Sequence, residues 1–254
     1  MGDAAETMRL LLFVLAKDEE SQLEKTVCGL QAACAPGSLA GMVLLLAPNA
    51  TQGCRRVAEA LQNADFRVAV EVVVQPSWDF PACVKSVLLD RQISHLLFVA
   101  SDYYYESSAI ADLIARAKEC PGSIHRLSRT MPGGGFSSDY NAIEVLLYRL
   151  FCVFVRVLYG CRVTDPASAI AVVPERLFRL LKFRQGSLLI GAEWMFALLR
   201  SQAAPIVEIP AVTLPRAEGK GFSTVVSRLR YVPVAIRMRF IPLKNIWEEG
   251  AFRE

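Results

Sequence analysis

The segment His95–Asp102, HLLFVASD, is an uninterrupted apolar run that ends in a serine and an aspartate. Such a run is typical of a strand that is covered on both faces of a sheet. Similar runs, each followed by a break and a helix-like segment, occur earlier at Met8–Ala16 (MRLLLFVLA), Gly41–Ala47 (GMVLLLA) and Arg67–Val74 (RVAVEVVV). Four β–α alternations predict an α/β fold with a mostly parallel, twisted central sheet and helices on both faces.

Polar residues follow each of these predicted strands. In parallel α/β sheets, ligands bind off the carboxyl ends of the strands. This rule alone points to Asp18, Asn49, Ser77 and Asp102 as candidate binding residues. An aspartate at a strand end can also cap the following helix, and that alternative stays open for Asp102, although Ser107 and Ser108 already offer caps there.

The composition limits the class of protein. Of 254 residues, 53% are hydrophobic and 21% are charged, which is too many charges for a polytopic membrane protein. The net charge of +3 is too small to indicate a nucleic-acid partner. Seven cysteines without a C-x-x-C pair, together with two histidines, argue against zinc and favour a reducing compartment. Asp3 and Glu6 precede the first apolar run, so we expect no signal peptide and a cytoplasmic protein.

The second half of the chain differs in pattern from the first. Ser128–Gly135 is predicted to be a glycine-rich loop, and Tyr140–Tyr159 a long apolar helix. Short strands are expected at Pro166–Val173 and Ile206–Leu214. The tail from Ser227 to Ile246 is apolar but contains five basic residues.

The segment Phe98–Ile114, FVASDYYYESSAIADLI, resembles the part of GT-A-fold, family 2 glycosyltransferases that carries their D-x-D motif, with Asp102 at the second aspartate. Four further segments are similar to family motifs in the same order: Lys17–Glu20, Ser128–Gly135, Arg162–Val173 and Val207–Thr224. The resemblance covers about residues 9–224. It is closest to the polyprenyl-phosphate sugar synthases, of which dolichol-phosphate mannose synthase is the type member.

This resemblance implies a transferase that moves a sugar from a GDP- or UDP-linked donor to polyprenyl phosphate or a related membrane lipid. It implies one GT-A-like domain over residues 1–254, with a donor half at about 8–125, an acceptor half at about 126–226 and a basic tail at 227–254. The implied donor-binding residues are Asp18, Glu19, Asn49, Ser77 and Ser128. The implied catalytic residues are Asp102, Arg129, Asp165, Arg216 and Lys220.

The reaction explains why basic residues are expected. The departing diphosphate needs neutralisation, and a phosphate acceptor is already anionic, so it needs no general base. Arg129, Arg216 and Lys220 supply positive charge, and arginine suits bidentate contacts to phosphate. Two other interpretations stay open: Arg216 and Lys220 only solvate a loop, and Asp165, which precedes Pro166, only ties a turn.

The chain also departs from the family pattern on the donor side. Ala100 and Tyr104 replace two metal ligands of the D-x-D-x-Q motif, and Ala47-Pro48 stands where the family has acids. Mg²⁺ and Mn²⁺ prefer carboxylate oxygens, so we expect a metal on Asp102 only together with the donor diphosphate. The alternative function is a non-catalytic relative that serves as a membrane- or partner-binding scaffold.

Two segments have a composition that suits a membrane surface. Residues 140–159 and 227–246 combine a wide apolar face with scattered basic residues and aromatics such as Tyr148 and Trp247. For 140–159, a helix buried in the domain core is an equal alternative. We expect a peripheral protein on the cytoplasmic face of a membrane.

Overall fold

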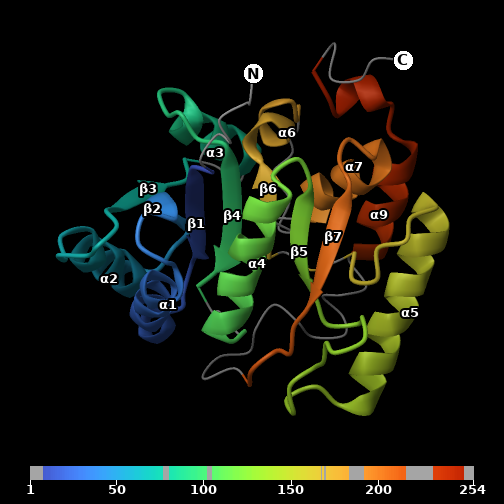
Figure 1. Ribbon diagram of the computed structural model, residues 1–254, viewed down its shortest axis with the longest axis horizontal. Coiled ribbons are helices and arrows are strands. Elements are labelled where there is room, and N and C mark those ends of the chain that lie inside the picture. The colour runs from blue at the N-terminus through green and yellow to red at the C-terminus, as the bar shows by residue number, and fades with distance from the viewer. Residues whose placement is uncertain are drawn as a thin grey trace.

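A seven-stranded sheet forms the centre of the molecule, with helices on both of its faces (Figure 1). The computed structural model describes residues 8–76, 80–101, 105–166, 168, 170–182, 192–215 and 231–248. The strands are β1 (Leu10–Ala16), β2 (Leu39–Leu46), β3 (Val70–Val74), β4 (His95–Ala100), β5 (Ile124–Ser128), β6 (Ala171–Pro174) and β7 (Ile206–Pro210). The helices are α1 (Glu20–Ala33), α2 (Gln52–Gln62), α3 (Phe80–Leu88), α4 (Ser107–Glu119), α5 (Ala142–Tyr159), α6 (Glu175–Arg179), α7 (Ala192–Ser201), α9 (Tyr231–Phe240) and the short 3₁₀ helix η1 (Leu243–Asn245).

The strands follow the order β3-β2-β1-β4-β6-β5-β7 across the sheet. β6 is antiparallel to both of its neighbours, and the other adjacent strands are parallel. All strands except β6 therefore point the same way, and their carboxyl ends share one edge. The predicted α/β fold with a mostly parallel sheet is confirmed. Strands from both halves of the chain belong to this one sheet. The two halves meet where β4, from the first half, pairs with β6, from the second.

The sequence did not predict β5, because three residues of its IHRLS sequence are polar. All five residues are nevertheless buried, and Arg126 Nη2 donates to the carbonyl oxygen of Ser168 at 2.6 Å. The prediction placed Ser128 in a loop, and this is wrong: Ser128 is the last residue of β5. Ser128 and Arg129 therefore stand at the same sheet edge as the residues after β1 and β2.

Two apolar cores lie on the two faces of the sheet. α1, α2 and α4 cover one face, while α3, α6, α7 and α9 cover the other together with the carboxyl-terminal part of α5 (Figure 1). Leu10–Val14 of β1 have no exposed surface, as expected for a strand covered on both faces. On the second face, the Phe98 ring stacks on Phe13 with centroids 5.3 Å apart and lies 5.4 Å from Trp194.

α5 matches the predicted long helix and begins and ends at recognisable caps. Asn141 Oδ1 accepts the backbone N–H of Glu144 at 2.9 Å, and Glu144 Oε2 accepts that of Asn141 at 3.1 Å, which forms a capping box. Gly160 ends the helix with φ of 62°, a value that favours glycine. One face of α5 is buried and the other is exposed. Neither prediction for this segment, a helix on a membrane surface or a helix buried in the domain core, therefore describes the whole helix.

The described part of the tail, residues 231–248, packs against α5 through α9. Tyr159 Oη donates to the carbonyl oxygen of Ala235 at 2.8 Å, and Ala235 and Met238 are buried. Trp247 and Tyr148 are also buried, at 2% and 7% exposure, so their prediction as membrane-surface aromatics is wrong. Within the described ranges, we find no helix that combines the length and apolarity needed to cross a bilayer.

Candidate functional site

The donor-side positions that the structure describes lie along one edge of the sheet. Asp18 and Asn49 follow β1 and β2, and Ser101 follows β4. Backbone hydrogen bonds of 2.8 Å join the end of β2 to the end of β1, and Ser101 to β1. The structure thus brings together the loops after β1, β2 and β4, as the strand-end rule predicts.

Four of the predicted site residues lie outside the described residues: Ser77, Asp102, Arg216 and Lys220. Three of them directly follow a described residue: Pro76 precedes Ser77, Ser101 precedes Asp102, and Pro215 precedes Arg216.

Glu19 ties the loop after β1 to the end of β4. Its Oε2 accepts hydrogen bonds from the backbone N–H groups of Lys17 (2.8 Å) and Asp18 (3.1 Å) and from Ser101 Oγ (2.8 Å). The Asp18 side chain is 52% exposed and forms an ion pair with Lys17 at 3.7 Å. Of these two acids, Asp18 therefore presents a carboxylate to solvent, while Glu19 supports the loop from within.

Asn49 lies in a loop that Arg55 holds in place. Arg55 Nε and Nη2 donate to the carbonyl oxygens of Ala50 (3.2 Å) and Pro48 (3.1 Å). Asn49 is exposed, and its side chain makes no hydrogen bond to another described residue. Its amide is therefore free to contact a ligand.

The glycine-rich loop packs directly on the Ser128–Arg129 backbone. A Cβ atom added to Gly134 would lie 2.4 Å from the carbonyl oxygen of Ser128, closer than real Cβ atoms come. Gly133 has φ of 86°, a conformation that residues with a side chain rarely adopt. Glycine is needed at both positions because the loop turns sharply against β5.

This loop also contacts the segment that leads to Arg216. Gly135 N donates to the carbonyl oxygen of Ala211 at 3.2 Å, and Thr213 N donates to that of Gly135 at 3.1 Å. Thr213 further forms a β-bridge with Tyr105. Tyr105, which follows Asp102 in sequence, and Thr213, which precedes Arg216, thus meet beside the glycine-rich loop.

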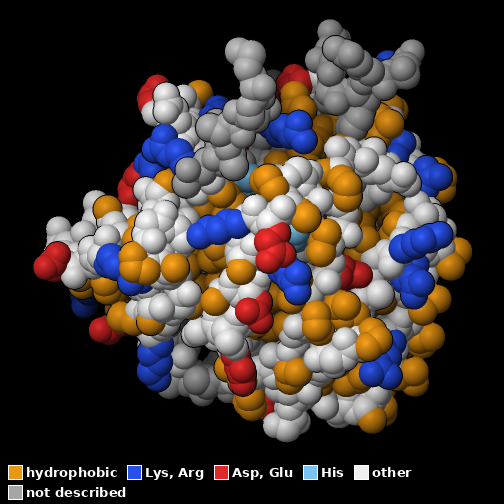
Figure 2. Space-filling model, viewed as in Figure 1, with side chains coloured by type: hydrophobic (Ala, Val, Ile, Leu, Met, Phe, Trp, Pro, Cys, Tyr) orange, Lys and Arg blue, Asp and Glu red, His pale blue; other side chains and the backbone are white. Residues whose placement is uncertain are grey.

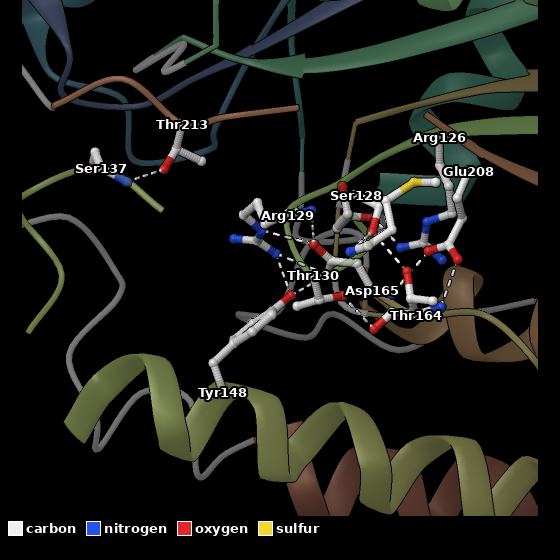
Figure 3. A network of polar contacts seen from close by, with 12 residues as sticks. Arg126, Ser128, Arg129, Thr130, Ser137, Tyr148, Thr164, Asp165, Glu208 and Thr213 are labelled. Atoms are coloured by element: carbon white, nitrogen blue, oxygen red, sulfur yellow. Dashed lines mark hydrogen bonds and ion pairs between the residues drawn. The ribbon is translucent and has the colours of Figure 1, made fainter. Parts of the chain in front are cut away.

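Arg129 and Asp165 form a buried ion pair (Figure 3). Arg129 Nε donates to Asp165 Oδ2 at 2.8 Å, Nη2 donates to Oδ1 at 3.1 Å, and the Arg129 backbone N–H donates to Oδ2 at 3.0 Å. The side chains are 7% and 0% exposed. Tyr148 reaches the pair from α5, and its hydroxyl binds both Arg129 Nη2 and Asp165 Oδ1.

Glu208 of β7 holds the turn that carries Asp165. Its carboxylate accepts the backbone N–H groups of Thr164 at 2.6 Å and Asp165 at 2.8 Å. Thr164 is also bound from β5, because its Oγ1 lies 2.8 Å from Ser128 Oγ (Figure 3). The predicted donor-side residue Ser128 therefore supports the Asp165 turn, and its side chain is buried.

The charges of the pair stabilise each other. Burial acts to raise the pKa of Asp165, but the Arg129 charge and the hydrogen bonds to the carboxylate outweigh it and hold this pKa below its usual value. Burial acts to lower the pKa of Arg129, and the Asp165 charge outweighs it, so this pKa is raised. Burial raises the pKa of Tyr148, so its hydroxyl stays protonated. The cluster therefore contains a carboxylate, a guanidinium and a neutral phenol.

A divalent metal was expected only together with the donor diphosphate. Across the described part of the chain, no three His, Cys, Asp or Glu side chains gather into a possible metal site. The described residues alone therefore do not supply a three-ligand metal site.

Fold and site together define the class of architecture: the sheet is of the GT-A type, with strand-end loops gathered at one edge. Glucosyl-3-phosphoglycerate synthase from Mycobacterium tuberculosis, solved with Mn²⁺, UDP and phosphoglyceric acid, is similar with a TM-score of 0.65 and 15% identity over 92% of this chain and 80% of that chain. The same synthase with Mg²⁺ and UDP is similar with a TM-score of 0.64 and 14% identity over the same shares.

A third structure, described as a mycobacterial protein, is similar with a TM-score of 0.64 and 15% identity over 92% of this chain and 76% of that chain. No protein-family model and no curated protein matches the sequence. At these identities the likeness establishes the GT-A-type fold. The closer resemblance to polyprenyl-phosphate sugar synthases stays a prediction.

Proposed function

We propose that this protein transfers a sugar from a UDP- or GDP-sugar to polyprenyl phosphate or a related lipid phosphate, on the cytoplasmic face of a membrane. One observation carries the proposal. At one edge of a GT-A-type sheet, the donor-side loops lie together with the Arg129–Asp165 ion pair and the glycine-rich loop. Similar structures hold UDP or UDP-glucose, with Mn²⁺ or Mg²⁺ in several of them, which supports the donor class.

On the donor side, Asp18 and Asn49 are the residues that we assign to the nucleotide. The Asp18 carboxylate is exposed, and the Asn49 amide has no described partner, so both can form hydrogen bonds to a base or ribose. Ser77 and Asp102 complete the proposed donor set by their positions after β3 and β4. Glu19 acts indirectly by fixing the loop that carries Asp18.

For the transfer step, an oxygen of the acceptor phosphate bonds to the anomeric carbon of the sugar as the bond to the donor diphosphate breaks. The nucleoside diphosphate leaves with the bonding electrons, and no proton has to move. Because Asp165 compensates the charge of Arg129, we assign the net neutralisation of phosphate to Arg216 and Lys220. A divalent metal would be held between Asp102 and the donor diphosphate.

The exposed side of α5 and α9 supports the choice of a lipid acceptor. We define the α5–α9 face by the exposed apolar side chains Ile143, Leu146, Leu150, Val153, Val157, Ile236 and Phe240. On α5 they recur every three or four residues, as a helix lying along an apolar surface requires. Figure 2 shows hydrophobic and basic side chains interspersed where α5 lies in Figure 1.

The charges beside this face favour an anionic partner. Residues 142–162 and 231–245 contain six basic residues: Arg149, Arg156, Arg162, Arg237, Arg239 and Lys244. Their single acid, Glu144, is engaged in the capping box of α5. A second copy would bring the same positive charges together, whereas an anionic bilayer attracts them and accepts the apolar side chains. Tyr148 lies on the inner side of the same helix, so α5 joins this face to the site.

The test is a transfer assay with radiolabelled UDP-glucose or GDP-mannose as donor and two acceptors in separate reactions. Polyprenyl phosphate in detergent is one acceptor, and 3-phosphoglycerate is the other. We expect label in the organic phase with polyprenyl phosphate. Label only in the phosphoglycerate product would support the transferase activity and contradict the proposal of a lipid acceptor. No label with any donor would contradict the transferase.

The second candidate function is a non-catalytic scaffold. Ala100, Tyr104 and Ala47-Pro48 favour it, because these replacements remove metal and base contacts together. A scaffold would bind vesicles through the α5–α9 face but would bind no nucleotide.

A further inference from the structure

We propose that Tyr148 and Asp165 are positioning residues that present one guanidinium nitrogen of Arg129, Nη1, to a phosphate oxygen of the substrate. The inference rests on the proposed function for the nature of the substrate. Its geometry comes from the contacts of Arg129, which are set out in Figure 3.

All but one of the hydrogen-bonding nitrogens of Arg129 are occupied. The backbone N and Nε bind Asp165 Oδ2, and Nη2 binds Asp165 Oδ1 and the Tyr148 hydroxyl. Nη1 has no hydrogen-bond partner among the described residues. In Figure 3 the free nitrogen points away from the Asp165 carboxylate. This leaves one group whose N–H bonds are available to a ligand.

Aromatic rings also restrict the guanidinium. The Tyr148 ring centroid lies 4.5 Å from Arg129 Cζ, and that of Phe136 lies 5.6 Å from it. The two rings meet edge to face, with centroids 5.4 Å apart. The two hydrogen bonds to the Asp165 carboxylate and these rings hold the guanidinium in one orientation. Little side-chain freedom is therefore left to lose when an anion binds.

The arrangement suits orientation better than stabilisation. The free energy needed to remove two charges from water offsets much of the attraction between them. A buried ion pair therefore adds little net stability compared with apolar side chains packed in its place. The pair also has no net charge, so Arg129 attracts a phosphate through directed N–H groups rather than as a free cation. The donor diphosphate and the acceptor phosphate share this chemistry, and either can be the ligand.

The experiment compares two tyrosines of α5. Tyr148 and Tyr159 are both 7% exposed, but among the described residues the Tyr159 hydroxyl donates only to the backbone of α9, at Ala235. We would titrate UDP and farnesyl phosphate, each separately, into the wild type, Tyr148→Phe and Tyr159→Phe by calorimetry. We expect Tyr148→Phe to weaken one of the two ligands by about tenfold, as loss of an orienting hydrogen bond implies. Tyr159→Phe should leave both affinities unchanged.

The ligand that weakens identifies the phosphate that Arg129 contacts. Arg129→Lys keeps the positive charge but loses the paired N–H contacts of the guanidinium with Asp165. It should weaken binding of the same ligand. Equal effects of the two tyrosine substitutions, or full affinity in Arg129→Lys, would overturn the proposal. If Tyr148→Phe selectively loses phosphate binding but the wild type transfers no sugar, the positioning role of Tyr148 is supported and the proposed transferase function is contradicted.

Discussion

Ser101 Oγ donates a hydrogen bond of 2.8 Å to Glu19 Oε2, which links the end of β4 to the loop after β1. These residues are neighbours of Asp102 and Asp18, two candidates for donor binding. One carboxylate therefore joins the two loops on which the donor site is proposed to depend.

Glu19→Gln should weaken nucleotide binding without removing any proposed ligand contact. The amide has one acceptor oxygen without charge, so the three hydrogen bonds to Oε2 weaken, and the unfolding free energy should fall by about 1–3 kcal/mol. UDP affinity from calorimetry should fall with it. The control is Glu24→Gln on the exposed side of α1, which should change neither quantity. Equal stability of the two variants would contradict the role of Glu19.

The Arg129–Asp165 pair predicts a specific pattern in a double-mutant cycle. Asp165→Leu leaves the Arg129 charge buried without its partner and should destabilise the fold by about 3–5 kcal/mol. Arg129→Met together with Asp165→Leu should lose less than the two single changes added together. Chemical denaturation measures all four proteins. Strict additivity would show that the two side chains do not interact.

Stability should depend on pH through the same carboxylate. The pKa of Asp165 is lowered in the folded state, so its stabilising effect is fully present above the pKa of the unfolded chain, near 3.9. It is lost as pH falls from about 4 through the lower folded-state pKa. The difference in unfolding free energy between wild type and Asp165→Asn should therefore be constant above about pH 5 and shrink below about pH 4. A difference that grows on acidification would contradict this assignment.

Gly134→Ala should disrupt the loop on Ser128 and Arg129. The added Cβ would meet the carbonyl oxygen of Ser128 at 2.4 Å, and backbone would have to move, which costs about 1–3 kcal/mol. Gly122→Ala is the matched control, because a Cβ there meets nothing within 4 Å. Thermal unfolding of both variants measures the difference. A Gly134→Ala protein as stable as Gly122→Ala would refute the close packing.

The α5–α9 face predicts binding to anionic vesicles. The double variant Leu150→Glu with Val157→Glu should lose most co-sedimentation with phosphatidylserine vesicles, because it places two acids on the apolar stripe. Leu89→Glu is the control, since Leu89 is 71% exposed and follows α3. Binding should weaken at high salt and with neutral phosphatidylcholine vesicles. Concentration-dependent dimerisation of wild type, lost in the double variant without any vesicle binding, would assign the face to a second copy instead.

The sequence predicts most of the sheet because a strand covered on both faces reads as a continuous apolar run. β1, β2 and β4 are of this kind, and the strand-end rule then places Asp18 and Asn49 at one edge. β5 was missed because three of its five residues are polar yet buried, and a hydropathy pattern does not reveal the hydrogen bond from Arg126 to the carbonyl oxygen of Ser168.

The candidate site was predicted only in part for a similar reason. Arg129 and Asp165 were each singled out, but their pairing joins positions 36 residues apart in sequence and depends on the turn that Glu208 holds. Tyr148 lies among apolar residues of α5 and therefore resembled a membrane-surface aromatic. Its helical position on the buried side, opposite Leu150 and Val157, could have indicated an inward role.

The most direct test of the central claim is whether this sheet edge binds a nucleoside diphosphate. Calorimetric titration of UDP and GDP, each with and without Mn²⁺, would separate the transferase from the scaffold. We expect at least one nucleotide to bind, more tightly with Mn²⁺ present, while Mn²⁺ alone gives no heat of binding. Flat titrations for both nucleotides and for UDP-glucose and GDP-mannose, by a protein that still binds vesicles, would contradict the account.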